Sequence, residues 1–243
     1  AAHIPVRRLG KAEEIAYAIQ EGAWAYLKRQ FKTIAVILIP LAVIVFVTNP
    51  VDVITYAAVK SVDVEPGRIF GSGTVLDSSR FRYLIAEKAD LSVSNVHGYI
   101  VGEHGDSEIS LWSSVSIGGV PADEFRLDGK LLFDKETQSA ISHDVVNAAY
   151  EIIEGKGATN LAIGLSTARI IEAIRGHQHR VLPVSTLQTG AYGIDDVCLS
   201  LPTVVTAEGA GKVLEIPLSE DELAGLRASA QTLHDAWASV QGT

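Results

Sequence analysis

Apolar and polar positions alternate along the chain with two different periods, and these periods predict helices and strands in succession. A helical spacing of apolar residues predicts helices over residues 12–32, 51–60, 78–89, 135–154 and 159–174. Strands are predicted over residues 41–47 and 96–101, around 109–117, and as two runs within 180–205. Strands and helices that follow one another in this way predict an α/β fold.

The longest apolar run extends from residue 34 to residue 47 and is interrupted only by Pro40. A helix that spans a membrane needs about 20 apolar residues, so this run is too short for one. We expect a helix end, a turn at Pro40 and then a fully buried parallel strand over residues 41–47, because β-branched residues follow the proline. If no strand precedes it, one edge of this strand is left open to pairing with another chain.

The C-terminal part of the chain carries two local signals. Residues 180–205 hold two alternating runs, VLPVSTL and VCLSL, joined by a glycine-rich turn at residues 190–193, which predicts an antiparallel hairpin. Ser219 and Glu222 have the spacing of a capping box, so a final helix is expected to begin there. The apolar residues of this helix recur at heptad-like spacing and are expected in the core or in a subunit contact: Leu223, Leu226, Leu233, Trp237 and Val240.

Composition limits the kinds of protein that this sequence can be. With 243 residues, of which 47% are apolar, the chain can form one large domain or two small ones. Its net charge of −9 provides no excess of Lys and Arg of the kind that binds nucleic acid, and no membrane span is predicted. The single cysteine, Cys198, cannot form an internal disulfide, which favours the cytoplasm. Its alternating context, VCLSLP, predicts a buried structural thiol.

Two short segments, LDSSRFR and VGEHGDSE, supply a carboxylate, a guanidinium and an imidazole. The imidazole of His104, with an ordinary pKa of about 6.5, suits proton transfer near neutral pH, and Asp77 can fix its tautomer. Arg80 offers a planar fork of donors that matches a substrate carboxylate. A solvated loop histidine and an ordinary helix-surface ion pair are the structural alternatives for these residues. No set of metal ligands is predicted.

From about Val45 onward the chain resembles the L-lactate and malate dehydrogenase family, most closely the bacterial allosteric L-lactate dehydrogenases. The matching segments follow the family's order: FVTNPVDVITY, RIFGSGTVLDSSRFRYLIAE, VHGYIVGEHGDSEISLW, GKGATNLAIGLS and VLPVSTL. The resemblance implies an α+β substrate and catalytic domain, similar to the C-terminal domain of the family, over residues 69–243. Residues 1–68 are then a truncated or rebuilt remnant of a dinucleotide-binding domain, with a truncated Rossmann-type parallel sheet.

The resemblance implies roles for five residues around a 2-hydroxy acid. His104 would donate and accept the proton, with Asp77 as its partner, and Arg80 would hold the carboxylate of pyruvate or L-lactate. Asn49, in VTNPVD, would lie beside the nicotinamide and the substrate oxygen. Thr159 stands where lactate dehydrogenases carry a threonine near the small side chain of the substrate, which favours lactate over malate.

The resemblance also implies NAD as the cofactor. Val47, Asn49, Ser72 and Ile163 would border its nicotinamide ring, and a core position is an equally good explanation for Val47 and Ile163. No G-x-G-x-x-G turn precedes Asn49, and the mobile loop with its polarising arginine is absent. Phosphate contacts at a helix N-terminus are hard to replace, so NAD binding is expected to be weak or lost.

Arg82 and His97 match the two basic positions that bacterial allosteric lactate dehydrogenases use to bind fructose bisphosphate across a subunit interface. Both kinds of side chain can contact a phosphate. A surface arginine and a solvated histidine are the plain alternative. The resemblance therefore implies a homodimer or homotetramer whose assembly or activity responds to the sugar bisphosphate.

The first twenty residues have a different character. HIPVRRLGKAEEIAYAI resembles a C-terminal segment of the short-chain dehydrogenases and reductases, a stretch that carries no catalytic residue in that family. It stands directly before LKRQFKTIAVILIP, which again resembles the lactate dehydrogenases, and the chain contains no methionine. We therefore expect a chimera, a designed sequence or a spliced fragment.

Three hypotheses for the function follow from the sequence. The first is an NAD-dependent L-lactate dehydrogenase that transfers a hydride between NADH and pyruvate, supported by the retained His104, Asp77 and Arg80. The second is an inactive substrate-domain fragment or chimera that folds or oligomerises without turnover, supported by the missing phosphate cradle. The third is a binding module for anionic metabolites that uses Arg80, or Arg82 with His97.

Overall fold

The structure is a computed structural model, and it describes residues 42–156 and 161–241. Contacts group Ala1–Ala42 into one compact unit and Val43–Thr243 into another. The helix expected over residues 12–32, the chimeric origin expected for the first twenty residues, and Thr159 all lie outside the described residues. The division expected at residue 68 stays a prediction.

A mixed sheet of five strands forms the centre of the second unit. In spatial order the strands are β1 (Ile44–Phe46), β2 (Ile69–Gly71), β10 (Arg180–Thr189), β11 (Asp195–Thr206) and β12 (Gly209–Val213). β1 and β2 are parallel, as the sequence predicts for a remnant of a parallel sheet, and every other pair is antiparallel. The single register pair of Ser185 with Gly71 joins the parallel part to the antiparallel part.

The strand expected over residues 41–47 is shorter and less buried than predicted. β1 has only three residues, and all three are half-buried. Within the described residues β1 pairs with β2 alone, so its second edge is unpaired. A strand at the edge of a sheet is less buried than a central strand, which has neighbours on both sides. The prediction of a fully buried strand was therefore wrong, whereas the prediction of an unpaired edge agrees with the sheet order.

The hairpin expected over residues 180–205 is confirmed. β10 and β11 pair from Arg180 with Val205 up to Thr189 with Asp195, and a short 3-10 turn, η3 (Ala191–Gly193), joins them. Cys198 lies on β11 and is fully buried, as predicted. Burial raises the pKa of this thiol far above its ordinary value, because the thiolate would lose its hydration.

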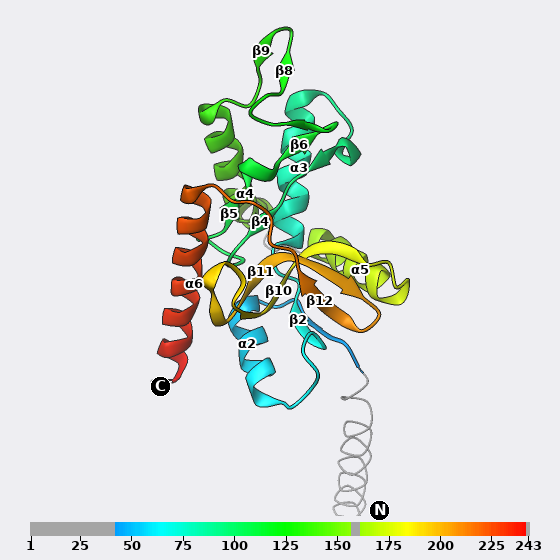
Figure 1. The fold of residues 1–243 in the computed structure, drawn as a ribbon, viewed down its shortest axis with the longest axis vertical. Helices are drawn as coiled ribbons and strands as arrows, with labels where there is room; N and C mark the ends of the chain where they lie inside the picture. Colours follow the sequence, from blue (N-terminus) through cyan, green and yellow to red (C-terminus); the bar gives the residue numbers. More distant parts are fainter. Residues whose placement is uncertain (1–41, 157–160, 242–243) are drawn as a thin grey trace, which may run out of the picture. The chain divides into compact units, whose positions relative to one another are not determined.

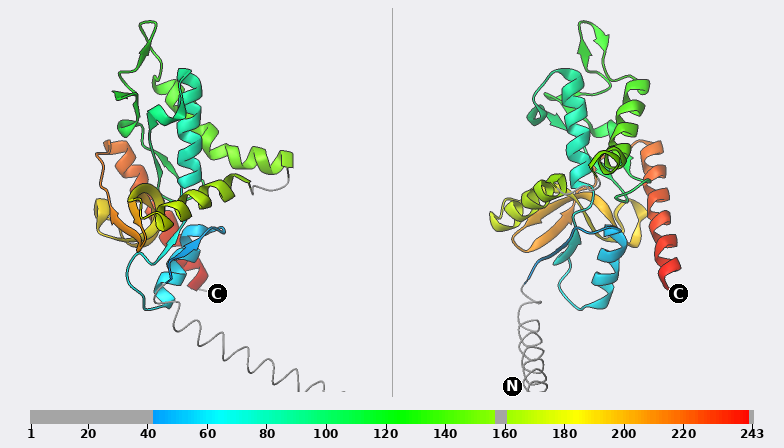
Figure 2. Two further views of the ribbon diagram at one scale, coloured as in Figure 1. Left: turned by 90° about the vertical axis from the view of Figure 1, so that its right-hand side faces the viewer. Right: turned by 180° about the vertical axis from the view of Figure 1, so that it is seen from behind.

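The described residues form five helices (Figures 1 and 2). They are α2 (Val51–Ser61), α3 (Val75–Ala89), α4 (Lys135–Lys156), α5 (Leu161–Arg175) and α6 (Glu220–Gln241). Four of them lie around the sheet, and α4 packs against α3 beyond it. α5 and α6 both contact β11, and α2 contacts β2 and β10. α3 begins three residues earlier than the predicted residue 78. Its first turn therefore includes Asp77.

The short strands lie beyond the central sheet, in the green segment of Figure 1. They pair as β3 (Val96–His97) with β6 (Ser116–Ile117), β6 with β7 (Val120–Pro121), β4 (Ile100–Val101) with β5 (Ile109–Ser110), and β8 (Arg126–Leu127) with β9 (Lys130–Leu131). A 3-10 turn, η1 (Val93–Asn95), leads from α3 into β3, and a second, η2 (Trp112–Ser114), connects β5 to β6. The strand predicted over residues 96–101 is therefore two strands, because β3 and β4 turn to different partners.

Three clusters of buried apolar side chains hold these elements together. The first packs α3 against α4 and the short strands, around Phe81 and Phe133. The second packs α6 against β11, around Leu226 and Leu199. The third fills the space between α5 and the sheet, around Phe70. Burying apolar surface of this kind away from water stabilises the folded state by about 25 cal/mol per Å².

The final helix begins as the sequence predicts. The amide of Glu222 donates to Ser219 Oγ at 3.2 Å, and the amide of Ser219 donates to the Glu222 carboxylate at 2.8 Å, which is the reciprocal capping box. On the apolar stripe of α6, Leu226 and Leu233 are buried in the core, whereas Val240 is 54% exposed. In the part of the chain that the structure describes, no helix combines the length and the apolar character needed to cross a membrane.

Candidate active site

The first turn of α3 carries two of the predicted site residues. Asp77 is only 3% exposed, and its position near the N-terminus of a helix favours a negative charge. Arg80 lies almost one turn later on the same face. The start of α3 is fixed by the buried Thr74, whose amide donates to Ser200 Oγ at 3.1 Å and whose hydroxyl donates to the carbonyl of Ile100 at 2.6 Å.

His104 lies on the loop between β4 and β5. Gly102, just before it, forms an isolated bridge with Ser200, in which each amide donates to the other's carbonyl at 2.9 Å. Gly102 has a φ of +90°, and a Cβ atom there would lie 2.7 Å from Ser229 Oγ. Only glycine fits such a backbone position without strain. The loop is thus tied to β11 immediately before the imidazole.

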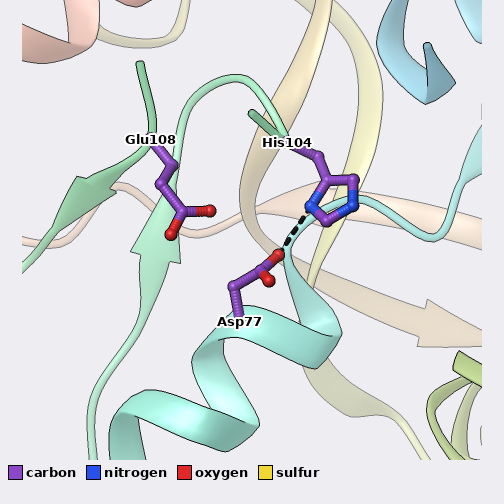
Figure 3. A group of neighbouring side chains, drawn as sticks. All are labelled: Asp77, His104 and Glu108. Atoms are coloured by element: carbon purple, nitrogen blue, oxygen red, sulfur yellow. Dashed lines mark hydrogen bonds and ion pairs between the residues drawn. The ribbon is translucent and has the colours of Figure 1, made fainter. Parts of the chain in front are cut away.

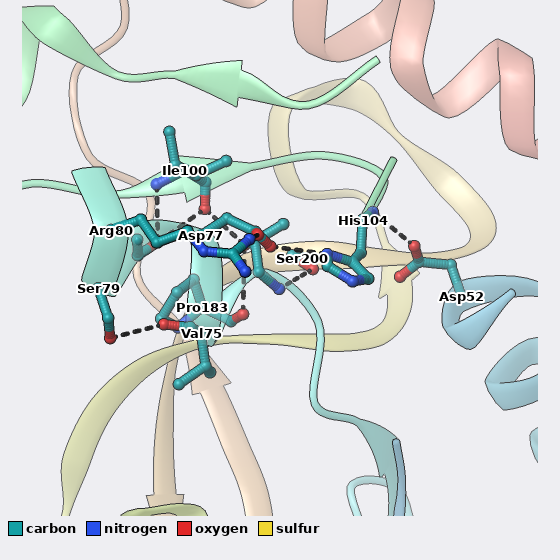
Figure 4. A network of polar contacts seen from close by, with 11 residues as sticks. Asp52, Val75, Asp77, Ser79, Arg80, Ile100, His104, Pro183 and Ser200 are labelled. Atoms are coloured by element: carbon teal, nitrogen blue, oxygen red, sulfur yellow. Dashed lines mark hydrogen bonds and ion pairs between the residues drawn. The ribbon is translucent and has the colours of Figure 1, made fainter. Parts of the chain in front are cut away.

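The structure brings Asp77, Arg80 and His104 together (Figure 4). Asp77 Oδ2 is 2.6 Å from His104 Nδ1, and Asp77 Oδ1 accepts a hydrogen bond from Arg80 Nη1 at 3.3 Å. One carboxylate therefore contacts both cations, through different oxygens. Because Nδ1 is engaged with Asp77, Nε2 is the ring nitrogen that His104 can offer to a substrate.

Arg80 retains a donor for a ligand. Its Nη2 is buried and has no hydrogen-bond partner among the described residues. A buried charged donor without a hydrogen-bond partner destabilises the folded state, and such groups are rare in folded proteins. A small carboxylate that accepts from Nη2 would remove this cost.

The surroundings of His104 favour its protonated form. Burial lowers the pKa of the imidazole, but the hydrogen bond and the charge of Asp77, with a smaller contribution from the charge of Asp52, outweigh burial and raise the pKa to about 9. His104 is consequently an imidazolium at neutral pH, which is the form that can donate a proton.

Two further carboxyl groups border the site, and the sequence analysis did not identify either of them. Glu108, directly before β5, points toward Asp77 and His104 in Figure 3. Burial, followed by repulsion from Asp77, raises its pKa to about 9, so that it is a neutral acid at pH 7. The only sequence signal was its place in the segment VGEHGDSE.

Asp77, His104 and Glu108 also form a cluster that could in principle bind a metal ion, since one ligand atom of each lies within 4.8 Å of the others. The 2.6 Å contact between Asp77 and His104 argues against it. Two ligand atoms that are each about 2.1 Å from one ion and only 2.6 Å apart would subtend an angle of about 77°, well below the tetrahedral angle. A hydrogen bond explains this contact better.

Asp52 is the second unpredicted carboxyl group. It lies in the first turn of α2, is 2% exposed, and accepts a hydrogen bond from the backbone amide of His104 at 2.8 Å. Its Oδ1 has no hydrogen-bond partner in the described part of the chain. Burial raises the pKa of Asp52 to about 6, and contacts with Ser185 and His104 oppose this shift. Asp52 therefore fixes the backbone of the imidazole-bearing loop.

The raised pKa of Asp52 leads to a first prediction. Its carboxylate destabilises the fold increasingly as the pH rises from the ordinary pKa of 3.8 through 6. The substitution Asp52→Asn keeps an acceptor for His104 and removes the buried charge. It should raise the free energy of unfolding at pH 8 by about 1–3 kcal/mol and by much less at pH 4.

Urea unfolding at both pH values tests this prediction, with the exposed Asp63→Asn as the matched control. A lower stability of Asp52→Asn at pH 8 would contradict it.

The structure also describes the four residues that were predicted to border a nicotinamide ring. Asn49 and Val47 are exposed in the segment between β1 and α2, and Val47, at 40% exposure, is not a core residue. Ser72 is buried, and its amide donates to the carbonyl of Phe46 at 2.7 Å. Ile163 is half-buried on α5. Their contact with a nicotinamide stays a prediction.

The glycines nearest to the site serve protein packing and not phosphate binding. A Cβ atom at Gly71 would lie 2.7 Å from Thr55 Oγ1, and one at Gly73 would lie 2.4 Å from Ser200 Oγ. These glycines let the backbone approach neighbouring protein atoms. These two glycines therefore provide no cradle for the phosphates of a dinucleotide.

Comparison with known proteins agrees with this geometry. A family model described as the lactate/malate dehydrogenase, alpha/beta C-terminal domain, matches residues 74–241. The L-lactate dehydrogenase of Bifidobacterium animalis subsp. lactis is 49% identical over 197 residues, which are 81% of this chain and 62% of that protein. The L-lactate dehydrogenase of Thermoanaerobacter sp. is 48% identical over 193 residues, which are 79% and 62% of the two chains.

Solved structures give the same result. The minor L-lactate dehydrogenase of Enterococcus mundtii, in a ligand-bound form, matches with a TM-score of 0.77 and 37% identity over 81% of this chain and 62% of that one. The L-lactate dehydrogenase of Clostridium thermocellum matches with a TM-score of 0.74 and 42% identity over 82% and 65%. The chain spans about 62% of the length of the curated relatives. On these grounds it belongs to the lactate/malate dehydrogenase family.

Proposed function

We propose that this chain is an L-lactate dehydrogenase-like oxidoreductase, in which His104 exchanges a proton with the oxygen of a small 2-oxo or 2-hydroxy acid. One observation supports the proposal most strongly, namely that Asp77 contacts both His104 and Arg80. This arrangement couples a proton donor to a carboxylate-binding group within one small site.

In the direction of pyruvate reduction, Arg80 holds the substrate carboxylate and thereby orients the carbonyl group. His104, protonated at neutral pH, donates its Nε2 proton to the carbonyl oxygen, and Asp77 stabilises the imidazolium before transfer. The neutral Glu108 adds no second negative charge that would repel the substrate. A reduced nicotinamide would supply the hydride in this chemistry, and the described residues offer no glycine-rich cradle for its phosphates.

A second candidate is an anion-binding module without turnover. The lack of a glycine-rich phosphate cradle among residues 42–156 and 161–241 supports this alternative, as does the unpartnered Nη2 of Arg80, which can hold a carboxylate without any cofactor. An inactive substrate-domain fragment would have the same fold and no ligand at this site. The two alternatives differ in whether a carboxylate such as oxamate binds.

We also retain the expected effector site and homo-oligomer as part of the proposal. Arg82 Nη2 and Arg169 Nη1 both donate to Ser79 Oγ, at 3.3 and 3.4 Å. Burial, and then the charge of Arg169, lowers the pKa of Arg82. A phosphate would relieve the repulsion between the two guanidinium groups, which fits fructose bisphosphate as the ligand. His97 is exposed on β3 and can contact a partner or an effector.

The decisive experiment measures NADH oxidation with pyruvate for the unaltered chain and for His104→Gln. If the proposal holds, the unaltered chain turns over and His104→Gln loses about 100- to 10,000-fold in kcat, because general acid catalysis is removed. The exposed His143→Gln serves as the control and should retain full activity.

Calorimetry with oxamate completes the test. Turnover that survives in His104→Gln would refute the assigned proton donor. Oxamate binding without turnover in the unaltered chain would support the anion-binding module, and neither binding nor turnover would support the inactive fragment.

A further inference from the structure

Two histidines follow the C-terminus of α5, away from the residues assigned above. The helix ends in a cap where the amide of His177 donates to the carbonyl of Ile174 at 3.2 Å and that of Gln178 donates to Ala173 at 3.1 Å. His177 and His179 both adopt the left-handed conformation, with φ of +45° and +50°. Residues other than glycine rarely adopt it, and here it brings the two imidazoles face to edge.

The two rings form a direct contact at the surface. His177 Nε2 and His179 Nε2 are 3.1 Å apart, and the ring centroids are 4.5 Å apart. The amide of Ala207 donates to His177 Nδ1 at 3.2 Å, so Nδ1 of this neutral ring is an acceptor and its proton lies on Nε2. The Nε2 proton of His177 is then donated to Nε2 of His179.

The same spacing suits two ligands of one metal ion. Nitrogen atoms that are 3.1 Å apart and each about 2.1 Å from an ion subtend an angle of about 95°, close to that of adjacent positions in octahedral or distorted tetrahedral coordination. We propose that His177 and His179 form a surface site for a borderline divalent transition-metal ion, with Zn²⁺ as the probe. Both side chains are exposed, so water can complete the coordination.

Glu208 supplies the outer support that such a site needs. Its Oε2 lies 3.6 Å from His177 Nδ1 and accepts a hydrogen bond from Thr206 Oγ1 at 2.6 Å, which holds the carboxylate in place. A histidine that binds a metal through one nitrogen commonly donates from its other nitrogen to a carboxylate. Zn²⁺ replaces the proton on His177 Nε2, and that proton moves through water to Nδ1. The hydrogen bond from the amide of Ala207 to Nδ1 then breaks, this exposed amide turns to water, and Nδ1 donates to Glu208 instead. The protonation count of the ring is unchanged.

Calorimetry with Zn²⁺ on the full chain tests the proposal, together with long-range ¹H–¹⁵N spectra that report the tautomer of each imidazole. Zn²⁺ should shift the Nε2 resonances of His177 and His179 and convert His177 from the Nε2–H to the Nδ1–H tautomer. His177→Gln and His179→Gln should each lose this binding, and Glu208→Gln should weaken it by about 10-fold.

His143→Gln is the matched control, because His143 Nδ1 also lies 3.6 Å from a carboxylate oxygen, that of Asp144, but no second histidine of the described residues contacts it. It should bind Zn²⁺ as the unaltered chain does. The proposal is overturned if zinc affinity is the same in His177→Gln and His179→Gln, or if Zn²⁺ shifts His104 and leaves His177 and His179 unchanged.

Discussion

Replacing Asp77 with asparagine is expected to lower the pKa of His104 from about 9 to its ordinary value of 6.5 or below. Burial by itself lowers this pKa, and the hydrogen bond and charge of Asp77 are the largest contributions that oppose burial. An asparagine keeps the shape of the side chain and removes its charge. An NMR titration of the imidazole measures the shift directly, without any need for turnover.

The same substitution should change how stability depends on pH. The folded-state pKa of His104 lies above the unfolded value, so its stabilising contribution is fully present below about pH 6.5 and is lost as the pH rises through 9. The difference corresponds to about 3 kcal/mol, which Asp77→Asn should remove.

Urea unfolding at pH 6 and pH 10 gives this difference when both chains carry Glu108→Gln, because Glu108 also titrates in this range, with the exposed Asp123→Asn as the control. A pKa of about 9 for His104 in Asp77→Asn would mean that the Asp77 carboxylate does not stabilise the protonated imidazole.

Replacing Arg80 with lysine is expected to weaken oxamate binding by about 100-fold, which is on the order of 3 kcal/mol. Lysine retains the positive charge but has no second donor at the position of Nη2, which is the nitrogen left without a partner. The loss therefore measures the fork geometry and not the charge alone.

Calorimetry in the presence of NADH compares Arg80→Lys with Arg126→Lys, an exposed arginine on β8 that should bind oxamate as the unaltered chain does. Equal affinities in the two variants would mean that Arg80 does not hold the carboxylate.

Local patterns sufficed for those elements whose signals lie within a few residues. The capping box of Ser219 and Glu222 and the hairpin over residues 180–205 have partners that are close in the sequence, and the structure confirms both. The early start of α3 was missed because Thr74, which fixes it, is held by Ser200 and Ile100, and no local pattern reveals such distant contacts. The burial of β1 was overestimated for a similar reason, since it depends on the strands beside it.

The site shows the same division. Asp77, Arg80 and His104 could be identified from two recognisable segments, and they do converge in the structure. Asp52 could not, because its carboxylate reaches the amide of His104 across 52 positions of sequence. Glu108 was not predicted because its raised pKa results from burial in the folded chain, which the sequence around His104 does not reveal.

The shared carboxylate of Asp77 links two equilibria. When an organic acid accepts a hydrogen bond from Nη2 of Arg80, its negative charge adds to that of Asp77 in stabilising the imidazolium of His104. Near pH 9, where His104 is partly deprotonated, anion uptake thus promotes proton uptake at His104, and by thermodynamic reciprocity a bound proton tightens anion binding by the same factor. Under the proposed function, the site would take up acid and proton together in that pH range and release them together.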